Sequence, residues 1–287
     1  MHVILGGTGH VGSAVADALL ERGEPVTIVA RDPSRAEEHR WRGARVAAID
    51  VLDTGALAKL LRGAARAFLL NPPADPATDT VATERRTAAS IVAALDGARL
   101  EKVVAASTYG ARPGEGIGDF GVLHEMERSL AAGPVPADAV RAAYYFSNWD
   151  GALASARDEG VVRSFFPTDF ALPMVAPRDV GRFAARLLTE PSEGFRLHRV
   201  EGRRSYSPAD VAAAFAAALG RDVEAIEIPR ERWVPSMTAA GFSPAAAASF
   251  AAMTALVLEG GPAEPDEPVR GDASLRDHVE ALVRADR

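Results

Sequence analysis

The fold is decided by the first stretch of the chain, Val3-Ile4-Leu5-Gly6-Gly7-Thr8-Gly9-His10-Val11-Gly12. Its opening apolar run is typical of a buried parallel strand, and the residues after the glycines repeat apolar side chains at helical spacing. Gly7, Gly9 and Gly12 fit the spacing G-x-G-x-x-G, and Gly6, Gly9 and Gly12 fit G-x-x-G-x-x-G. Early glycines let backbone N–H groups approach a pyrophosphate, and the last one permits close packing of helix on strand.

This context of a strand before and a helix after favours a dinucleotide site over an ordinary glycine turn. We therefore expect the whole loop to contact the cofactor. Its predicted cofactor-binding residues are Gly6, Gly7, Thr8, Gly9, His10, Val11 and Gly12.

The end of the second predicted strand indicates which dinucleotide binds. That strand covers residues 25–30, and Arg31 is the first polar residue after its last apolar positions. In this fold an acid there bonds the ribose hydroxyl of NAD, whereas an arginine accommodates the 2′-phosphate of NADP. Asp32 followed by proline fits a helix cap, and Arg35 adds a second positive charge. We expect NADP(H) rather than NAD(H), with a solvated surface arginine as the alternative.

Composition excludes several classes of function. The chain has 287 residues, of which 48% are apolar and 25% charged, as in ordinary globular proteins of one large domain or slightly more. A net charge of -7 argues against nucleic acid as a partner. The lack of cysteine excludes disulfides and thiolate catalysis, and the scattered histidines predict no metal site.

The chain also shows no targeting or membrane-spanning pattern, because its first strand begins at residue 2 and no apolar run is long enough. We expect a cytoplasmic protein with a small-molecule substrate and no membrane partner. Its oligomeric state, monomer or homodimer, stays open.

Strand and helix signals alternate along two-thirds of the sequence and predict an α/β fold. We expect a Rossmann-like, doubly wound parallel sheet with a small C-terminal α+β lobe. The predicted strands cover 2–5, 25–30, 44–48, 66–70, 102–106 and 136–142, and the helices between them 11–22, 33–41, 54–62, 78–95 and 119–132.

The alternation loosens after residue 145. A helix over 180–188 and a strand over 195–200 are expected to return to the main sheet. We therefore assign residues 1–145 plus about 178–201 to a cofactor-binding domain, and about 146–177 and 202–287 to a smaller substrate-side lobe. The lobe is predicted to hold a helix at 147–157, a strand at 161–166, a Pro-rich segment at 167–177, a helix opening at 207–210, helices at 243–258 and 273–284, and a mobile loop at 260–268.

The carboxyl ends of the predicted strands supply further candidate residues, because ligands bind at that edge of such sheets. Asp50 closes the third strand and is placed to accept from the adenine amino group, with an ordinary loop aspartate as the alternative. Asn71 and Pro72 follow the fourth strand, where the backbone passes beneath the cofactor. Ser107 and Tyr109 end the fifth, beside the expected nicotinamide.

An aromatic cluster follows the sixth strand. Such side chains line a substrate pocket or belong to the core, and the pattern does not separate the two. The predicted substrate-binding residues are Tyr109, Tyr144, Tyr145, Asn148 and Trp149.

These residues together resemble the NmrA-like group of atypical short-chain dehydrogenase/reductases, which includes NADPH-dependent quinone oxidoreductases. The resemblance implies a Rossmann-like domain with a small C-terminal lobe, and an NADP(H) site that uses Gly6 to Gly12 and Arg31. It is carried by the glycine loop, by Arg31-Asp32-Pro33, by Ser107-Thr108-Tyr109-Gly110-Ala111, by the stretch from His124 to Leu130, by the stretch from Arg141 to Trp149, and by Pro177-Arg178-Asp179-Val180-Gly181.

The sequence departs from ordinary short-chain dehydrogenases in its catalytic residues. Those enzymes use Tyr-x-x-x-Lys, in which the lysine lowers the pKa of the tyrosine. Here the residues four positions after the four tyrosines are Pro113, Asn148, Trp149 and Asp210, so the pair is missing. The lysine of the isoflavone-reductase relatives is also unmatched, and a classical alcohol dehydrogenase is therefore not expected.

Two hypotheses remain, and we favour the first. In the first, the protein reduces a quinone or another conjugated carbonyl such as an enone, for which positioning in a dry pocket supplies most of the catalysis. Tyr109 would then hydrogen-bond the developing oxyanion, and His124 would supply a proton, unless it is an ordinary surface histidine. In the second, the protein senses NADP(H) without turnover and contacts a partner protein, as the resemblance also allows.

Overall fold

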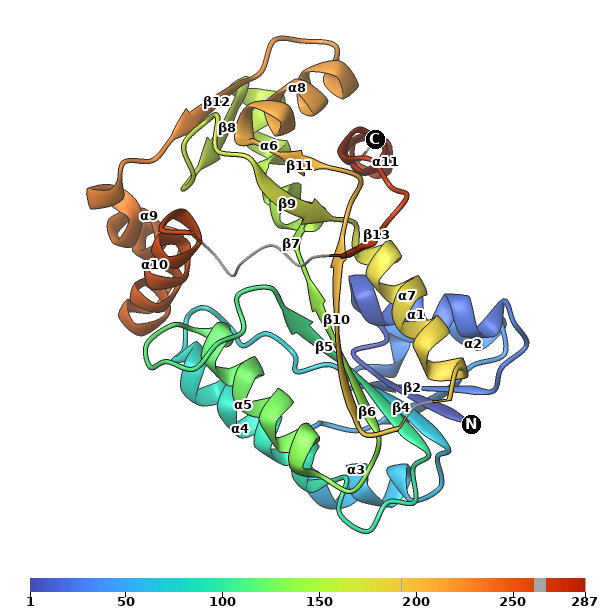
Figure 1. Cartoon of the computed structure of the whole chain (residues 1–287). Helices are drawn as coiled ribbons and strands as arrows, with labels where there is room; N and C mark the ends of the chain where they lie inside the picture. The colour runs from blue at the N-terminus through green and yellow to red at the C-terminus, as the bar shows by residue number, and fades with distance from the viewer. Residues whose placement is uncertain (192, 261–266, 287) are drawn as a thin grey trace.

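The computed structural model describes residues 1–191, 193–260 and 267–286. Its largest feature is a parallel sheet of eight strands in the order β13-β10-β6-β5-β4-β1-β2-β3 (Figure 1). This confirms the predicted Rossmann-like α/β fold. The strands are β1 (His2–Leu5), β2 (Val26–Ala30), β3 (Arg45–Ala48), β4 (Arg66–Leu69), β5 (Lys102–Thr108), β6 (Ala137–Ala142), β10 (Phe195–Glu201) and β13 (Val269–Arg270).

Helices cover both faces of this sheet. On one face lie α1 (His10–Leu20) and α7 (Pro177–Thr189), and on the other lie α3 (Thr54–Leu61), α4 (Thr80–Ala93) and α5 (Asp119–Ala132). Successive side chains of a strand point to opposite faces of the sheet. Ile4 packs toward α1 and α7, and Leu5 packs toward the layer of α3, α4 and α5. The near-continuous apolar runs of the strands follow from this burial on both faces.

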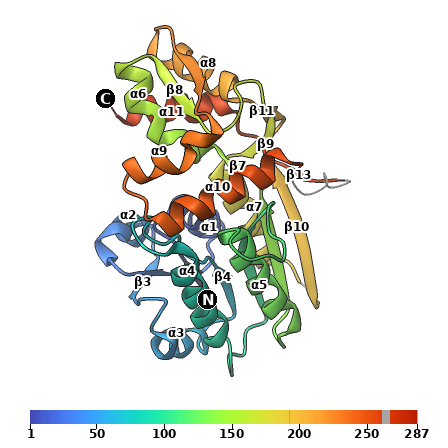
Figure 2. The ribbon, with the colours of Figure 1, turned by 90° about the vertical axis from the view of Figure 1, so that its left-hand side faces the viewer.

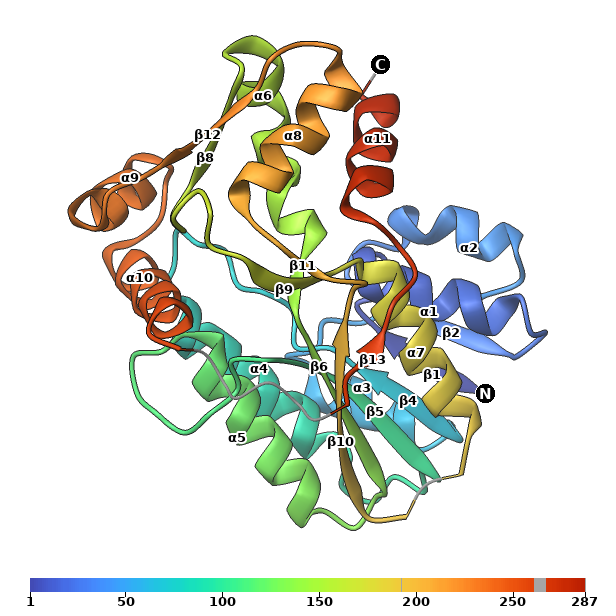
Figure 3. The ribbon, with the colours of Figure 1, turned by 45° about the horizontal axis from the view of Figure 1, so that its top comes forward.

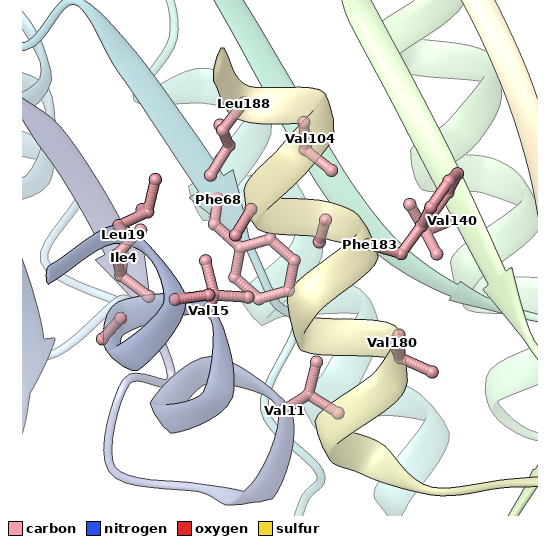
Figure 4. Close-up of a cluster of buried hydrophobic side chains, with 14 of the residues drawn as sticks. Ile4, Val11, Val15, Leu19, Phe68, Val104, Val140, Val180, Phe183 and Leu188 are labelled. Atoms are coloured by element: carbon pink, nitrogen blue, oxygen red, sulfur yellow. The ribbon is translucent and has the colours of Figure 1, made fainter. Parts of the chain in front are cut away.

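The two helices of the first layer pack closely (Figure 4). Phe183 of α7 and Val15 of α1 belong to one buried cluster with Phe68 of β4. Gly181 permits the close approach, because a Cβ at this position would lie 2.5 Å from Cβ of Ala14. This packing holds the start of α1, and with it the glycine loop, against the sheet.

The strand order reverses beside β1, which pairs with β2 on one side and β4 on the other. Chain connections leave this point in opposite directions, so a crevice forms outside the carboxyl ends of these strands, where such folds bind ligands. The glycine loop follows β1 at this crevice.

The rest of the chain forms a lobe above that edge (Figure 2). It contains a three-stranded sheet, a two-stranded sheet and a buried cluster that includes Phe146 and Phe215. Its elements are β7 (Tyr144–Tyr145), η2 (Phe146–Ala152), α6 (Leu153–Asp158), β8 (Val161–Ser164), β9 (Leu172–Val175), β11 (Ser205–Tyr206), α8 (Pro208–Leu219), β12 (Glu224–Glu227), η3 (Arg230–Arg232), α9 (Trp233–Ala239), α10 (Pro244–Leu258) and α11 (Leu275–Ala285).

Several elements differ from their predicted forms. The helix expected at 33–41 is a 3-10 turn, η1 (Pro33–Ala36), followed by the short α2 (Glu37–Trp41), and the helix expected at 147–157 also begins as a 3-10 segment. The strand expected at 161–166 ends at Ser164 and pairs only with β12. The Pro-rich segment contains β9, which the sequence analysis missed because two- to four-residue strands leave almost no periodicity.

The chain returns to the large sheet after the lobe. β13 pairs in parallel with β10 and then leads to α11 (Figure 3). Most of the loop predicted at 260–268 lies outside the described residues. Within the described ranges, no helix has the length and apolar character needed to cross a membrane.

Candidate functional site

The glycine loop has the geometry of a tight turn. The backbone N–H of Gly9 donates to the carbonyl oxygen of Gly6 (3.0 Å), and Gly6 has a φ of +66°, a conformation that disfavours other residues. A Cβ at Gly7 would lie 2.7 Å from Cγ2 of Ile28, and one at Gly12 would overlap the carbonyl oxygen of Gly6. Gly6, Gly7 and Gly12 are therefore required by the packing of the chain itself.

Gly9 differs from these three glycines. The nearest atom to a Cβ placed there is the Gly6 oxygen at 3.5 Å, an ordinary contact. Gly9 is also the N-cap of α1, and no side chain there accepts from the first N–H groups of the helix. Such a helix start attracts an anion through its free N–H groups and its dipole. The loop therefore fits a pyrophosphate that approaches the backbone at Gly9.

A cavity of about 450 Å³ extends from this loop across the ends of β2 and β4. It brings together the glycine loop, Arg31 and Pro72, which lie far apart in the sequence. The residues that line it are Gly6, Thr8, Val29, Ala30, Arg31, Asp32, Arg35, Ile49, Val51, Leu70 and Pro72.

The carboxylate of Asp32 is used inside the chain. Its Oδ1 accepts from the backbone N–H (3.0 Å) and the hydroxyl (2.7 Å) of Ser34, so Asp32 is the N-cap of the turn η1. These bonds lower the pKa of Asp32. Arg31 and Arg35 thus line the cavity beside an aspartate that is held in a local turn, in agreement with the predicted helix cap.

Asp50 and Asn71, two further predicted nucleotide contacts, each form a hydrogen bond within the chain. Asp50 is exposed, and its Oδ1 accepts from the backbone N–H of Leu52 (2.9 Å), whereas its two neighbours line the cavity. Asn71 donates through Nδ2 to the carbonyl oxygen of Glu84 (3.1 Å), which fixes the chain after β4. This leaves Asp50 as a turn residue at the rim of the cavity.

Ser107 belongs to a buried polar network. Its hydroxyl donates to Oε1 of Glu127 (2.6 Å), and Arg141 donates to both carboxylate oxygens of Glu127 (2.8 and 2.6 Å). His124 lies on the rim of this network, with Nδ1 4.0 Å from Oε2 of Glu127. The Ser107 hydroxyl is therefore directed into the protein. The sequence analysis had quoted Glu127 and Arg141 only as parts of a resemblance.

The hydroxyl of Tyr109, which was expected to bond a substrate oxyanion, bonds a side chain of the protein. Its phenol donates to Oε1 of Glu201 (2.9 Å), a buried carboxylate that also pairs with Arg270. Burial raises the pKa of Tyr109 far above its usual value, and the bond to Glu201 raises it further. A phenol has one O–H to donate. In this structure Tyr109 gives it to Glu201, so the expected bond to a substrate oxyanion is not available from this arrangement.

The aromatic cluster divides into two parts. Trp149 is 6% exposed, and Tyr144 lies between Trp149 (ring centroids 6.0 Å apart) and Phe166 (5.7 Å) in the core of the lobe. Burial raises the pKa of Tyr144 to about 12. Tyr145 instead packs against the cluster under α7, and Asn148 is exposed. For Tyr144 and Trp149 the structure therefore favours the core alternative.

One carboxyl group in this region was missed by the sequence analysis. Asp119 is the first residue of α5, a position where acids are common and carry no particular signal. Burial, followed by the nearby charge of Glu84, raises its pKa to about 6, although backbone N–H groups at the helix start oppose this. Burial also raises the pKa of Glu84 itself. No local sequence pattern indicates this pairing, because it depends on how α4 packs on α5.

Across the described residues, no group of three or more His, Asp or Glu side chains is arranged to hold an ion. The absence of a metal stays a prediction.

Known proteins resemble this chain along most of its length. A sequence model of the NmrA-like family matches residues 2–273. An NAD(P)H azoreductase from Xenophilus azovorans is 26% identical over 248 residues, which cover 84% of this chain and 82% of that protein.

Two solved structures share the fold. An NADPH-dependent quinone oxidoreductase from Escherichia coli, complexed with NADPH, superposes with a TM-score of 0.82 at 19% identity, covering 98% of this chain and 99% of the other. The triphenylmethane reductase of Citrobacter sp., complexed with NADP(H), gives a TM-score of 0.81 at 17% identity, again covering 98% and 99%. At these identities the superpositions establish the fold alone.

Proposed function

The chain belongs to the NmrA-like family, and on this premise we propose that it is an NADPH-dependent reductase of quinones or other conjugated carbonyls. The observation that carries the proposal is the cavity that joins the glycine loop to Arg31 and Arg35. An uncapped helix start at one end suits a diphosphate, and two guanidinium groups at the other suit a monophosphate ester. The named activities of the azoreductase and the quinone oxidoreductase support the same reaction class.

In this proposal the first domain, residues 1–145 with about 178–201, holds the nucleotide. The backbone of residues 6–12 binds the diphosphate, Arg31 and Arg35 bind the 2′-phosphate, and Pro72 lies along the nucleotide. Asp50 and Ser107 contribute through the turn and the network that they stabilise. The bound cofactor would supply a hydride at its nicotinamide ring.

The smaller lobe would cover the substrate. Its predicted bounds, about 146–177 and 202–287, include β13, which instead joins the large sheet. Tyr145 and Asn148 are the proposed contacts, while Tyr144 and Trp149 stabilise the wall behind them. His124 is the proposed link for protons between the surface and the buried Glu127 network, since its Nδ1 lies 4.0 Å from Oε2 of Glu127. The net charge of -7 supports a small-molecule substrate rather than nucleic acid.

The experiment is a binding titration followed by an activity screen. NADPH affinity is measured first by fluorescence. Oxidation of NADPH is then followed at 340 nm with quinones, enones and azo dyes, the last because of the azoreductase relative. We expect tight binding and turnover with at least one quinone.

The second candidate function is a sensor that binds NADP(H) and contacts a partner protein. It is favoured by the missing Tyr-x-x-x-Lys pair and by the occupied phenol of Tyr109. Tight NADPH binding with no turnover on any acceptor would contradict the reductase and leave the sensor.

A further inference from the structure

The loop between β4 and α4, residues 70–79, contacts both the cofactor cavity and α10. Near its start, Pro72 lines the cavity. Near its end, it accepts two hydrogen bonds from Ser243, the residue before α10. The backbone N–H of Ser243 donates to the carbonyl oxygen of Pro76 (2.8 Å), and its hydroxyl donates to the carbonyl oxygen of Thr78 (2.7 Å). One short segment therefore connects the expected nucleotide site with the start of a helix of the lobe.

Hydrogen bonds give this β4–α4 loop a defined shape. The backbone N–H of Ala74 donates to Oε1 of Glu84 on α4 (2.9 Å). The backbone N–H and the hydroxyl of Thr78 both donate to the carbonyl oxygen of Asp75 (2.9 and 2.7 Å). A loop that is bonded in this way transmits a displacement from one end to the other, because packed and hydrogen-bonded segments shift as units.

The helix α10 joins the lobe to the rest of the molecule (Figure 2). Besides the bonds of Ser243, it packs on the residue before α5, since a Cβ at Gly118 would lie 2.5 Å from the sulfur of Met253. Its last two residues, Val257 and Leu258, pack against the buried cluster of the lobe, as Tyr144 does. A shift of α10 would therefore reach the wall behind the proposed substrate contacts.

For an apolar helix, α10 is poorly buried. Its 15 residues include no charged side chain, yet the buried ones are only Ala246, Ala247 and Ser249. In α7, by contrast, nine of 13 residues are buried. An element with few buried apolar contacts shifts at a lower cost than the core around it, and elements that move on ligand binding are of this kind. The helix α10 is therefore an element that a ligand can reposition.

We propose that the β4–α4 loop couples the cofactor cavity to α10, so that NADPH binding fixes α10 and raises the affinity for the acceptor. The nucleotide would contact Pro72 and fix the loop, and the two bonds from Ser243 would extend this effect to α10. Such a coupling is reciprocal, so a bound acceptor raises the affinity for the dinucleotide by the same factor. The inference rests on the proposed reductase function and deepens it, because it favours binding of the dinucleotide before the acceptor.

Hydrogen exchange of the full chain tests the coupling without turnover. Exchange of the backbone amides of residues 244–258 is measured with and without saturating NADPH. We expect NADPH to slow this exchange about 3-fold in the wild type, an effect of the size of one net hydrogen bond. Exchange of these amides at the same rate with and without NADPH would overturn the inference.

Substitutions at Ser243 separate its bond to the loop from its role as the cap of α10. Its hydroxyl also accepts from the backbone N–H of Ala246 (3.1 Å), so Ser243→Ala loses both interactions. Ser243→Asp keeps a good N-cap, but its carboxylate has no proton to donate to the carbonyl oxygen of Thr78. We expect the effect of NADPH on residues 244–258 to be largely lost in Ser243→Asp and retained in Ser243→Thr, which keeps the hydroxyl.

The matched control is Ser274→Ala. Ser274 caps α11 as Ser243 caps α10, and its hydroxyl accepts from the backbone N–H of Asp277 (3.1 Å). This variant loses a helix cap but no bond to the β4–α4 loop, so NADPH should slow exchange in α10 as it does in the wild type. An equal response to NADPH in Ser243→Asp and the wild type would overturn the loop as the connection.

A second measurement addresses the acceptor. Because NADP⁺ carries no hydride to transfer, duroquinone can be titrated by calorimetry in its presence without reaction. We expect duroquinone to bind the wild type about 3-fold more tightly with NADP⁺ than without it, and Ser243→Asp to show nearly equal affinities. Equal affinities in the wild type would overturn the effect on the acceptor.

Failure of the inference is distinguishable from failure of the proposed function. A wild type that reduces quinones but whose α10 exchanges at the same rate with and without NADPH would overturn the coupling and leave the reductase standing. Absence of NADPH binding would overturn both.

Discussion

The carboxyl edge and the amino edge of the large sheet differ in how their polar groups are paired. At the carboxyl edge, the start of α1 has no side-chain cap, Arg31 lies at a cavity, and Ser249 has no described partner. At the amino edge, Asp138 of β6 is 0% exposed and is surrounded by basic groups. Among these groups, the start of α1 and the Ser249 hydroxyl have no partner within the described residues, whereas the Asp138 carboxylate is fully paired.

The amino edge is held by one ionic cluster. The Asp138 carboxylate contacts Nζ of Lys102 (2.6 Å), Nε and Nη2 of Arg196 (2.7 and 3.0 Å) and Nε2 of His198 (2.9 Å). Lys102 is 1% exposed and also donates to the carbonyl oxygen of Leu187 (2.5 Å), near the end of α7, where helix carbonyls attract cations. This edge contributes stability, and changes there should leave ligand binding intact.

The largest expected effect is therefore on folding, from Asp138→Ala. It leaves Lys102 buried without its carboxylate, and we expect the free energy of unfolding to fall by about 3–5 kcal/mol. Urea denaturation measures this, and NADPH affinity of the folded protein should not change. Asp158→Ala, in an exposed pair with Arg157, is the control and should cost less than about 1 kcal/mol. An equal loss in both variants would contradict the cluster's role.

The same cluster predicts a pH dependence. Burial raises the pKa of Asp138, but hydrogen bonds from its three basic neighbours more than reverse this, so its pKa lies below the usual range. A carboxyl with a lowered folded pKa stabilises the protein above its unfolded pKa, about 3.9, and this contribution is lost as the pH falls further. The stability difference between wild type and Asp138→Ala should shrink below about pH 4.

A matched pair of glycine variants separates stability from binding at the carboxyl edge. Gly12→Ala places a Cβ against the carbonyl oxygen of Gly6, and we expect a loss of about 1–3 kcal/mol of stability as well as of NADPH binding. Gly9→Ala meets no close atom of the protein and should lose less than about 1 kcal/mol. Its NADPH affinity should still fall about 10-fold, because the Cβ occupies the path of the diphosphate. Unchanged affinity in Gly9→Ala would place the diphosphate elsewhere.

The smallest expected effect is that of Tyr109→Phe, which removes the hydrogen bond from the phenol to the buried carboxylate of Glu201. The phenol stabilises Glu201, so the variant should lose about 1 kcal/mol of stability and keep most of its kcat. Thermal unfolding and NADPH oxidation measure the two quantities. A large drop in kcat at unchanged stability would restore Tyr109 as the donor to the substrate.

The sequence predicted the parts of the molecule that have local signals. The alternation of strand and helix signals predicted the parallel sheet, and the spacing of Gly6, Gly9 and Gly12 after an apolar strand predicted the tight turn that leads into α1. The bond from Tyr109 to Glu201 joins residues 92 positions apart, and the effect of Glu84 on Asp119 depends on helix packing. Neither leaves a periodicity or a spacing to detect. The pairing of β13 with β10 was missed for the same reason.

We propose that the carboxyl edge binds NADPH with the diphosphate at the glycine loop and the 2′-phosphate at Arg31. The most direct test is to titrate NADPH and NADH into the wild type and Arg31→Ala. We expect the variant to lose about 10- to 100-fold in affinity for NADPH, the worth of a charge-assisted phosphate contact, and to bind NADH as before. Equal affinity of the wild type for both dinucleotides, unchanged in the variant, would contradict the claim.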